Sequence, residues 1–193
     1  MNAVGIRSRS GSIGSKRWRL WSTLALFTSL MLASAAPAEP VPVCEKTRPG
    51  HVVVYGDVEE ERVFSSADLL ALPRTTVQAR FHDGPLLTFE GVTLRELLVR
   101  SGVAADLRGG DLTRYVVVEA ADGYRALFSL AELDPGFRTQ VPILADRENG
   151  HAIEPRFGPF QVIQPAESQH ARSVRQVVCL RLGRDVEGDR PTG

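Results

Sequence analysis

The sequence predicts an α+β domain built around a mainly antiparallel or mixed sheet. Three observations support this class: strand patterns outnumber helix patterns, the helical segments are short, and residues 115–133 combine a tight hairpin with a short helix. The expected strands are residues 51–55, 60–64, 75–81, 86–90, 115–120, 124–128, 143–145, 160–164 and 175–182. The expected helices are residues 67–72, 94–100 and a short helix that begins after Ser129.

The hairpin at residues 115–128 is the centre of this prediction. Its first strand is rich in β-branched and aromatic residues, and Asp122-Gly123 is typical of a two-residue turn with positive φ angles. Such a turn pairs Glu119 with Ala126 and Val117 with Phe128. One face of the hairpin is then expected to carry Tyr115, Val117, Glu119, Tyr124 and Phe128. Because the other face is also partly apolar, we expect a central hairpin covered on both sides.

The helices are predicted from their caps. Thr93 precedes Leu94, and Glu96 follows at the spacing of a capping box, while Gly102 ends the helix. Ser129 and Glu132 repeat this spacing after the hairpin, and Ser65 or Ser66 caps the earlier helix, which Pro73 stops. Asn149-Gly150 indicates a further tight turn.

The first 38 residues are typical of a secretory signal peptide. A basic segment precedes an apolar run at residues 20–32, and small residues with an A-x-A pattern follow it. The alternative is an uncleaved membrane anchor, which the short apolar run and the prolines after it disfavour. We therefore divide the chain into a signal peptide (1–38), a lead-in segment (39–50), a domain (51–184) and a tail (185–193), with a periplasmic or secreted location and no stable membrane span after cleavage.

The charge balance excludes one class of partner. The chain has 23 basic and 23 acidic residues, and the signal peptide contains five of the basic ones (Arg7, Arg9, Lys16, Arg17, Arg19) and no acid. The remaining 18 basic residues against 23 acidic ones give the mature chain a net charge near −5. A protein that binds nucleic acid backbones needs a basic surface, so no nucleic acid partner is expected.

The two cysteines, Cys44 and Cys179, are expected to form a disulfide. An exported chain meets an oxidising compartment, and an even count leaves no thiol over. The alternative is two unpaired thiols, with Cys179 as a small buried hydrophobe in its strand.

Three blocks of sequence carry a resemblance to a known family. They are residues 90–98 (EGVTLRELL), 122–133 (DGYRALFSLAEL) and 158–165 (GPFQVIQP), which run into 174–177. Their order and spacing resemble the oxidoreductase molybdopterin-binding domain of sulfite-oxidase-like enzymes over nearly all of the mature chain. The chain is most similar to the small, single-domain, exported members. The resemblance implies a sulfite-oxidase-like fold and makes molybdopterin a possible cofactor.

One difference from the family pattern bears on the chemistry. In the enzymes a cysteine before the first of these helices binds molybdenum, whereas residues 75–90 of this chain contain no cysteine. His82 and Asp83 are poor substitutes for a thiolate as ligands of a soft metal. We therefore expect the fold without the molybdenum reaction, and no cofactor.

Candidate site residues form a basic cluster late in the chain. The resemblance places this region at the edge of the pterin site, and arginine forks suit planar or phosphate oxygens. The candidate ligand-binding residues are Arg156, His170, Arg172 and Arg175. The alternative is a solvated surface loop. His82-Asp83 favours turn chemistry over an acid–base pair or weak metal site, and Glu119 is expected to reach water rather than line a pocket.

Three functions remain open on this evidence. The first is an exported binding module for a small anionic ligand or a partner protein, without molybdenum catalysis. The second is a molybdopterin-dependent oxidoreductase whose molybdenum has a non-cysteine ligand or no ligand from the protein. The third is a structural or accessory subunit of a redox system that docks onto a membrane or a redox partner. The missing cysteine ranks them in that order, and enzymatic activity stays undecided.

Overall fold

The computed structural model describes residues 44, 47–167 and 169–185. The predicted signal peptide and almost all of the predicted tail therefore lie outside the described residues. Within them, no helix is long and apolar enough to cross a membrane.

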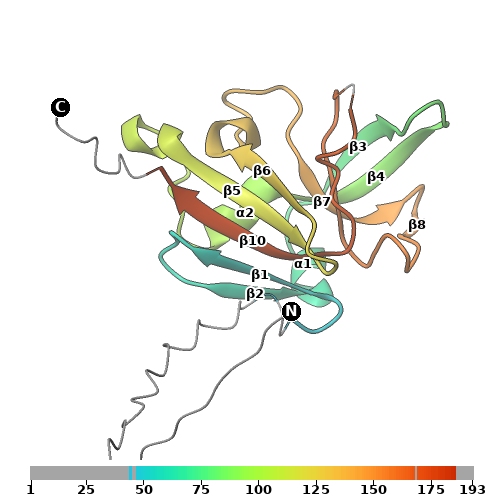
Figure 1. Ribbon diagram of the computed structural model, residues 1–193, viewed down its shortest axis with the longest axis horizontal. Coiled ribbons are helices and arrows are strands. Elements are labelled where there is room, and N and C mark those ends of the chain that lie inside the picture. Colours follow the sequence, from blue (N-terminus) through green and yellow to red (C-terminus); the bar gives the residue numbers. More distant parts are fainter. Residues whose placement is uncertain (1–43, 45–46, 168, 186–193) are drawn as a thin grey trace, which may run out of the picture. The chain divides into compact units, whose positions relative to one another are not determined.

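The described chain forms two five-stranded sheets with short helices, which confirms the α+β class (Figure 1). The first sheet has the order β2-β1-β10-β5-β6, with bounds Arg62–Ser65, His51–Gly56, Val177–Arg184, Arg114–Ala120 and Arg125–Ser129. The second has the order β3-β4-β7-β8, with bounds Thr75–Arg80, Leu86–Thr93, Ile143–Glu148 and His151–Ala152, while β9 (Gln161–Ile163) also pairs with β7. The parallel pair β1 and β10 makes the first sheet mixed.

The helices are α1 (Ser66–Leu70), α2 (Leu94–Arg100) and the 3-10 turns η2 (Gly109–Thr113) and η3 (Leu130–Leu133). Both predicted caps around the short helices are present, because Ser65 with Asp68 and Ser129 with Glu132 form complete capping boxes. Only one of the two hydrogen bonds of the capping box predicted for α2 is present. Thr93 accepts from the Glu96 amide, but the Glu96 carboxylate lies 2.8 Å from Arg100 instead of returning to the cap.

The core lies between the two sheets. Its largest apolar cluster joins the inner face of the first sheet to α2 and to residues of the second sheet, including Val54, Leu97, Val118, Phe128, Leu144 and Val162. A smaller cluster on the second sheet contains Phe89, Ile143 and Ile163. The disulfide and Val53 form a third cluster.

The hairpin forms where it was predicted, but its register is shifted by one residue. Glu119 pairs with Arg125 and Val116 with Phe128. Gly123 has a φ of 85°, whereas Asp122 stays out of the left-handed region, and the Gly123 amide donates to the carbonyl of Ala120. The loop therefore has three residues, a turn followed by one left-handed glycine.

This shift corrects the predicted faces of the hairpin. Phe128 lies in the core beside Val116 and Val118, whereas Leu127 faces outward and is 54% exposed. The prediction of a hairpin covered on both faces holds for β5, whose residues are nearly all buried. It is wrong for β6, where Arg125 and Leu127 on the outer face are exposed.

The second sheet continues further than predicted because Gly91 lets two backbones meet. β4 runs on through Gly91 to Thr93, with an irregularity in its pairing with β7 between Glu90 and Gly91. A Cβ atom at Gly91 would collide with the backbone of Leu144 and lie 2.6 Å from the Cα of Ala145. β7 likewise extends to Glu148, where Asn149 and Gly150 form the predicted turn, both with positive φ.

Candidate functional site

A cleft of about 440 Å³ lies between the end of β3, the hairpin turn and the loop before β10. We call it the histidine cleft. The ionisable side chains that line it are those of His82, His170, Arg175, Asp122 and Tyr124. The Tyr124 hydroxyl donates to the carbonyl of Ala171 at 2.7 Å, which fastens the hairpin turn to the loop that carries His170.

Two of the four predicted ligand residues lie in this cleft. The His170 ring is centred 5.0 Å from Phe81 and 5.8 Å from His82. The Arg175 guanidinium stacks 4.3 Å from the centre of the Phe157 ring, and no carboxylate pairs with it among the described residues. A cation that is ordered by stacking but has no counter-ion is suited to binding an anion.

Arg156 shares the aromatic ring with Arg175 but does not line the cleft. Its guanidinium lies 4.5 Å from the centre of Phe157, and its Nε lies 2.6 Å from Glu154 Oε2. The side chain is 72% exposed. The two arginines therefore stack on the same aromatic ring, but Arg156 pairs with a carboxylate outside the cleft and Arg175 lines the cleft.

Arg172 is held by protein groups on the other side of its loop. Its guanidinium donates to Glu132 Oε1 at 3.0 and 3.1 Å, pairs closely with Glu167, and lies 4.8 Å from the centre of the Phe128 ring. Hydrogen bonds with Glu167 and Glu132 raise the pKa of Arg172. That this arginine contacts a ligand stays a prediction, and its observed contacts position the loop.

His82 is the cleft residue that sequence reasoning assigned only to a turn. The turn exists, since the Gly84 amide donates to the carbonyl of Phe81 at 3.0 Å. However, His82 has a φ of 51°, which is uncommon outside glycine, and it lines the cleft beside His170, with the two rings edge to face. No local pattern signals this pairing because His170 comes from a distant part of the chain.

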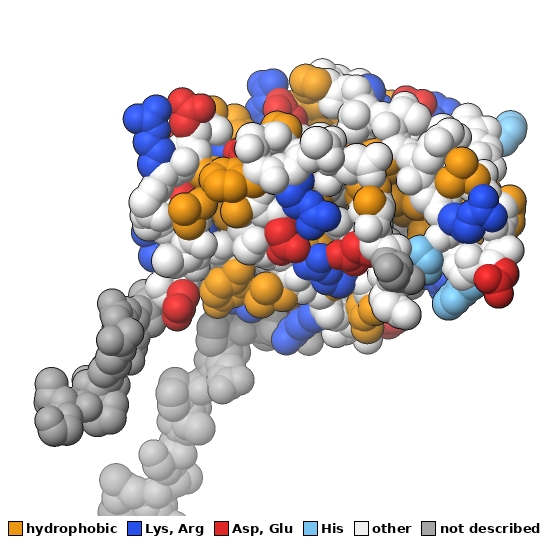
Figure 2. Space-filling view, turned by 90° about the horizontal axis from the view of Figure 1, so that it is seen from above, with side chains coloured by type: hydrophobic (Ala, Val, Ile, Leu, Met, Phe, Trp, Pro, Cys, Tyr) orange, Lys and Arg blue, Asp and Glu red, His pale blue; other side chains and the backbone are white. Residues whose placement is uncertain are grey.

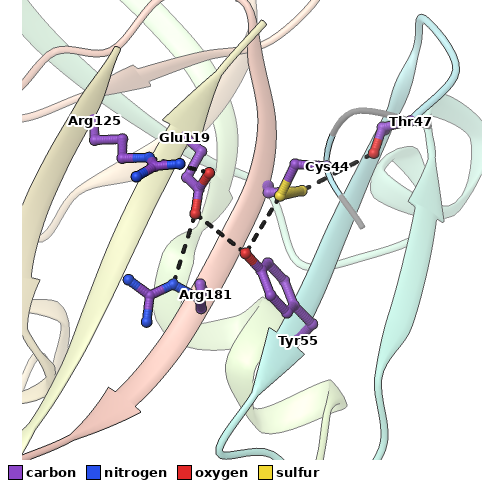
Figure 3. The surroundings of a disulfide bond; sticks show 7 residues. Cys44, Thr47, Tyr55, Glu119, Arg125 and Arg181 are labelled. Atoms are coloured by element: carbon purple, nitrogen blue, oxygen red, sulfur yellow. Dashed lines mark hydrogen bonds and ion pairs between the residues drawn. A yellow bond between two sulfur atoms is a disulfide. The ribbon is translucent and has the colours of Figure 1, made fainter. Parts of the chain in front are cut away.

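A second group of polar residues surrounds the Cys44–Cys179 disulfide on the outer face of the first sheet (Figure 3). The predicted disulfide is present, with the Cα atoms 5.7 Å apart. The Tyr55 hydroxyl donates to Glu119 Oε1 at 3.2 Å, and its oxygen lies 3.5 Å from Cys44 Sγ. Arg125 and Arg181 flank the Glu119 carboxylate at 3.3 and 3.7 Å.

The prediction that Glu119 reaches water is wrong. Its side chain is 7% exposed, because Arg125 of β6, Arg181 of β10 and Tyr55 of β1 surround its carboxylate. The buried carboxylate is compensated by these partners. Burial, followed by the negative charge of Glu119, raises the pKa of Tyr55.

The residues do not fit molybdenum bound through a cysteine thiolate. Both cysteines of the chain are joined to each other, and the cleft contains no sulfur ligand. The described residues also contain no group of three or more His, Cys, Asp or Glu side chains arranged to hold a metal ion.

On the face drawn in Figure 2, basic and acidic side chains are interspersed. Many arginines are paired in this way, Arg74 with Asp146 and Arg95 with Asp134 among them. The arrangement differs from the continuous basic stripe that nucleic acid backbones require.

Comparison with known proteins shows the fold and little more. No family model and no curated protein matches the chain. A solved structure, the sulfane dehydrogenase SoxCD from Paracoccus pantotrophus, matches with a TM-score of 0.55 and 22% sequence identity. The match covers 68% of this chain and 37% of that chain, so this chain is similar to a part of a larger protein. At this identity the likeness extends to the fold alone, and it agrees with the predicted α+β, sulfite-oxidase-like architecture.

Proposed function

We propose that this protein is an exported binding module that takes a small oxoanion in the histidine cleft, without molybdenum catalysis. Arg175 carries the proposal. It lines the cleft, it is ordered against Phe157, and no carboxylate pairs with it among the described residues. An arginine placed in this way offers its fork of N–H donors to oxygens of a ligand.

The two histidines complete the donor set. His82 and His170 both line the cleft with their rings 5.8 Å apart, and each imidazole can donate one hydrogen bond when neutral. In this proposal Arg172 does not contact the ligand but positions the residues that do. By joining Glu132 near the hairpin to Glu167 in the loop, it fixes the loop that carries His170 and Arg175.

Sulfur oxoanions are the first ligands to test. The structure to which the chain is similar is named as a sulfane dehydrogenase, and sulfite, sulfate and thiosulfate have the size and charge that one arginine and two histidines can bind. Phosphate serves as a probe of the same charge class.

The test is the thermal stability of the oxidised protein with increasing concentrations of each anion. A ligand at 100 times its dissociation constant stabilises the native state by about 2.7 kcal/mol, which raises the melting temperature by about 5–10 °C in a domain of this size. Arg175→Ala should abolish the rise. Arg156→Ala is the matched control, because it removes a guanidinium from the same ring outside the cleft. The proposal fails if no anion stabilises the wild type, or if both variants lose the response equally.

A second candidate function is an accessory subunit of a redox system, with a redox protein as its partner. The likeness to part of the sulfane dehydrogenase SoxCD supports it. Elemental analysis of protein from its native compartment separates both proposals from a molybdopterin-dependent oxidoreductase. We expect far less than one molybdenum per chain, and a stoichiometric content would favour the oxidoreductase.

A further inference from the structure

The disulfide borders a second cavity, of about 390 Å³, on the far side of the hairpin turn from the histidine cleft. Cys44, Glu119 and Arg125 line it. Cys44 is 9% exposed, whereas Cys179 is fully buried in β10. Cys44 lines the cavity and Cys179 does not, so a thiol that enters it approaches the disulfide from the Cys44 side.

The groups around this bond are those that sulfur exchange uses. Cys179 is the direct cross-strand neighbour of the buried Glu119, and the Tyr55 hydroxyl contacts both Glu119 and Cys44 Sγ (Figure 3). A disulfide that only ties two segments together requires neither a buried carboxylate nor a hydroxyl donor. Here a carboxylate that its arginine partners keep charged and a hydroxyl donor both lie beside the sulfur–sulfur bond, where they can act on a thiol or a thiolate.

We propose that Cys44–Cys179 is a thiol–disulfide exchange site that accepts two electrons from a dithiol. In the first step a thiolate of the dithiol attacks Cys44 Sγ, a new sulfur–sulfur bond forms, and the Cys44–Cys179 bond breaks. Cys179 Sγ receives the electron pair and takes up the proton that the attacking thiol lost to solvent. The direction of attack follows from the exposure of Cys44 alone.

In the second step the other thiolate of the dithiol attacks the sulfur that its partner has placed on Cys44. The dithiol becomes a disulfide, and Cys44 leaves as a thiolate. Tyr55 turns its hydroxyl from Glu119 to this thiolate, from which its oxygen is 3.5 Å away in the oxidised form. A phenol is protonated at neutral pH, and burial followed by the charge of Glu119 raises the pKa of Tyr55 further above its ordinary value, so the hydroxyl remains a donor.

The first experiment exposes the folded, oxidised protein to glutathione, a monothiol that can carry out the first step only. We expect a mixed disulfide on Cys44 and a free Cys179, both located by mass spectrometry after alkylation and digestion. The rate should be independent of urea below the unfolding transition. An adduct on Cys179, or a rate that follows global unfolding, would overturn the proposal.

The second experiment uses dithiothreitol, which carries out both steps, on Tyr55→Phe. This variant should release Cys44 from its mixed disulfide about tenfold more slowly, as expected for loss of one hydrogen bond to a thiolate, with the first step unchanged. Tyr124→Phe is the matched control, because its hydroxyl bonds the carbonyl of Ala171 away from the disulfide. Equal release rates in the two variants would refute the role of Tyr55 and the exchange mechanism with it. Neither experiment depends on anion binding in the histidine cleft.

Discussion

Replacing Cys44 with Ser should remove a large part of the stability of this domain. The disulfide closes a loop whose ends are 135 residues apart in sequence. In the chain-entropy model a loop of this length restricts the unfolded chain by about 17 cal/mol/K, which stabilises the native state by about 5 kcal/mol at 25 °C. Cys44 is 9% exposed, and its sulfur lies 3.5 Å from the Tyr55 hydroxyl. A serine hydroxyl there has a hydrogen-bond partner within reach, so the variant tests mainly the cross-link.

The expected loss corresponds to a fall in melting temperature of about 10–20 °C for a domain of this size. Urea unfolding of the oxidised wild type and of Cys44→Ser gives the free energies directly. The control is the wild type in excess reductant, which should unfold like Cys44→Ser to within about 1 kcal/mol. A difference below about 1 kcal/mol between the oxidised wild type and the variant would refute the reasoning, and would mean that the lead-in and β10 stay together without the bond.

Two further predictions concern Gly91 and the Arg172–Glu132 pair. Gly91→Ala should lower the free energy of unfolding by about 3 kcal/mol or more in urea titrations because its Cβ would collide with the backbone of Leu144, whereas Gly110→Ala, which meets its nearest atom at 3.6 Å, should change it by less than about 1 kcal/mol. Equal effects of the two substitutions would contradict the close approach. Although burial opposes it, the Arg172 hydrogen bond holds the pKa of Glu132 below its ordinary value of 4.5. The pair therefore stabilises the fold above that pH and loses its effect as the pH falls through the depressed pKa, so Arg172→Ala should flatten the stability curve on the acid side of pH 4.5. An unchanged curve would contradict this linkage.

Local signals predicted most of the elements. Serine caps, turn glycines and β-branched runs act over a few residues, so the positions of both capping boxes and of the Asn149-Gly150 turn could be predicted from the sequence. The register of the central hairpin could not. Asp-Gly fits both a two-residue and a three-residue loop, and only the packing of Phe128 into the core selects the longer loop.

The site was predictable only in part, for the same reason. Its basic residues were expected, but which of them face a cleft depends on contacts between distant segments. Arg172 and Arg175 are three residues apart, yet one is surrounded by carboxylates and the other by none among the described residues. Glu119 was expected in water because it is close to a turn, and the strand order that buries it emerges only when β10 inserts beside β5.

The place of β10 in the first sheet has a consequence for biosynthesis. This strand separates β1 from β5, although it follows all the other strands along the chain. While the ribosome is still producing residues 177–184, β1 and β2 have no partner through which to join the hairpin of β5 and β6, and the cross-link to Cys44 has no second sulfur. The first sheet can therefore be completed only after its last strand has left the ribosome, and until then the nascent chain remains incompletely folded.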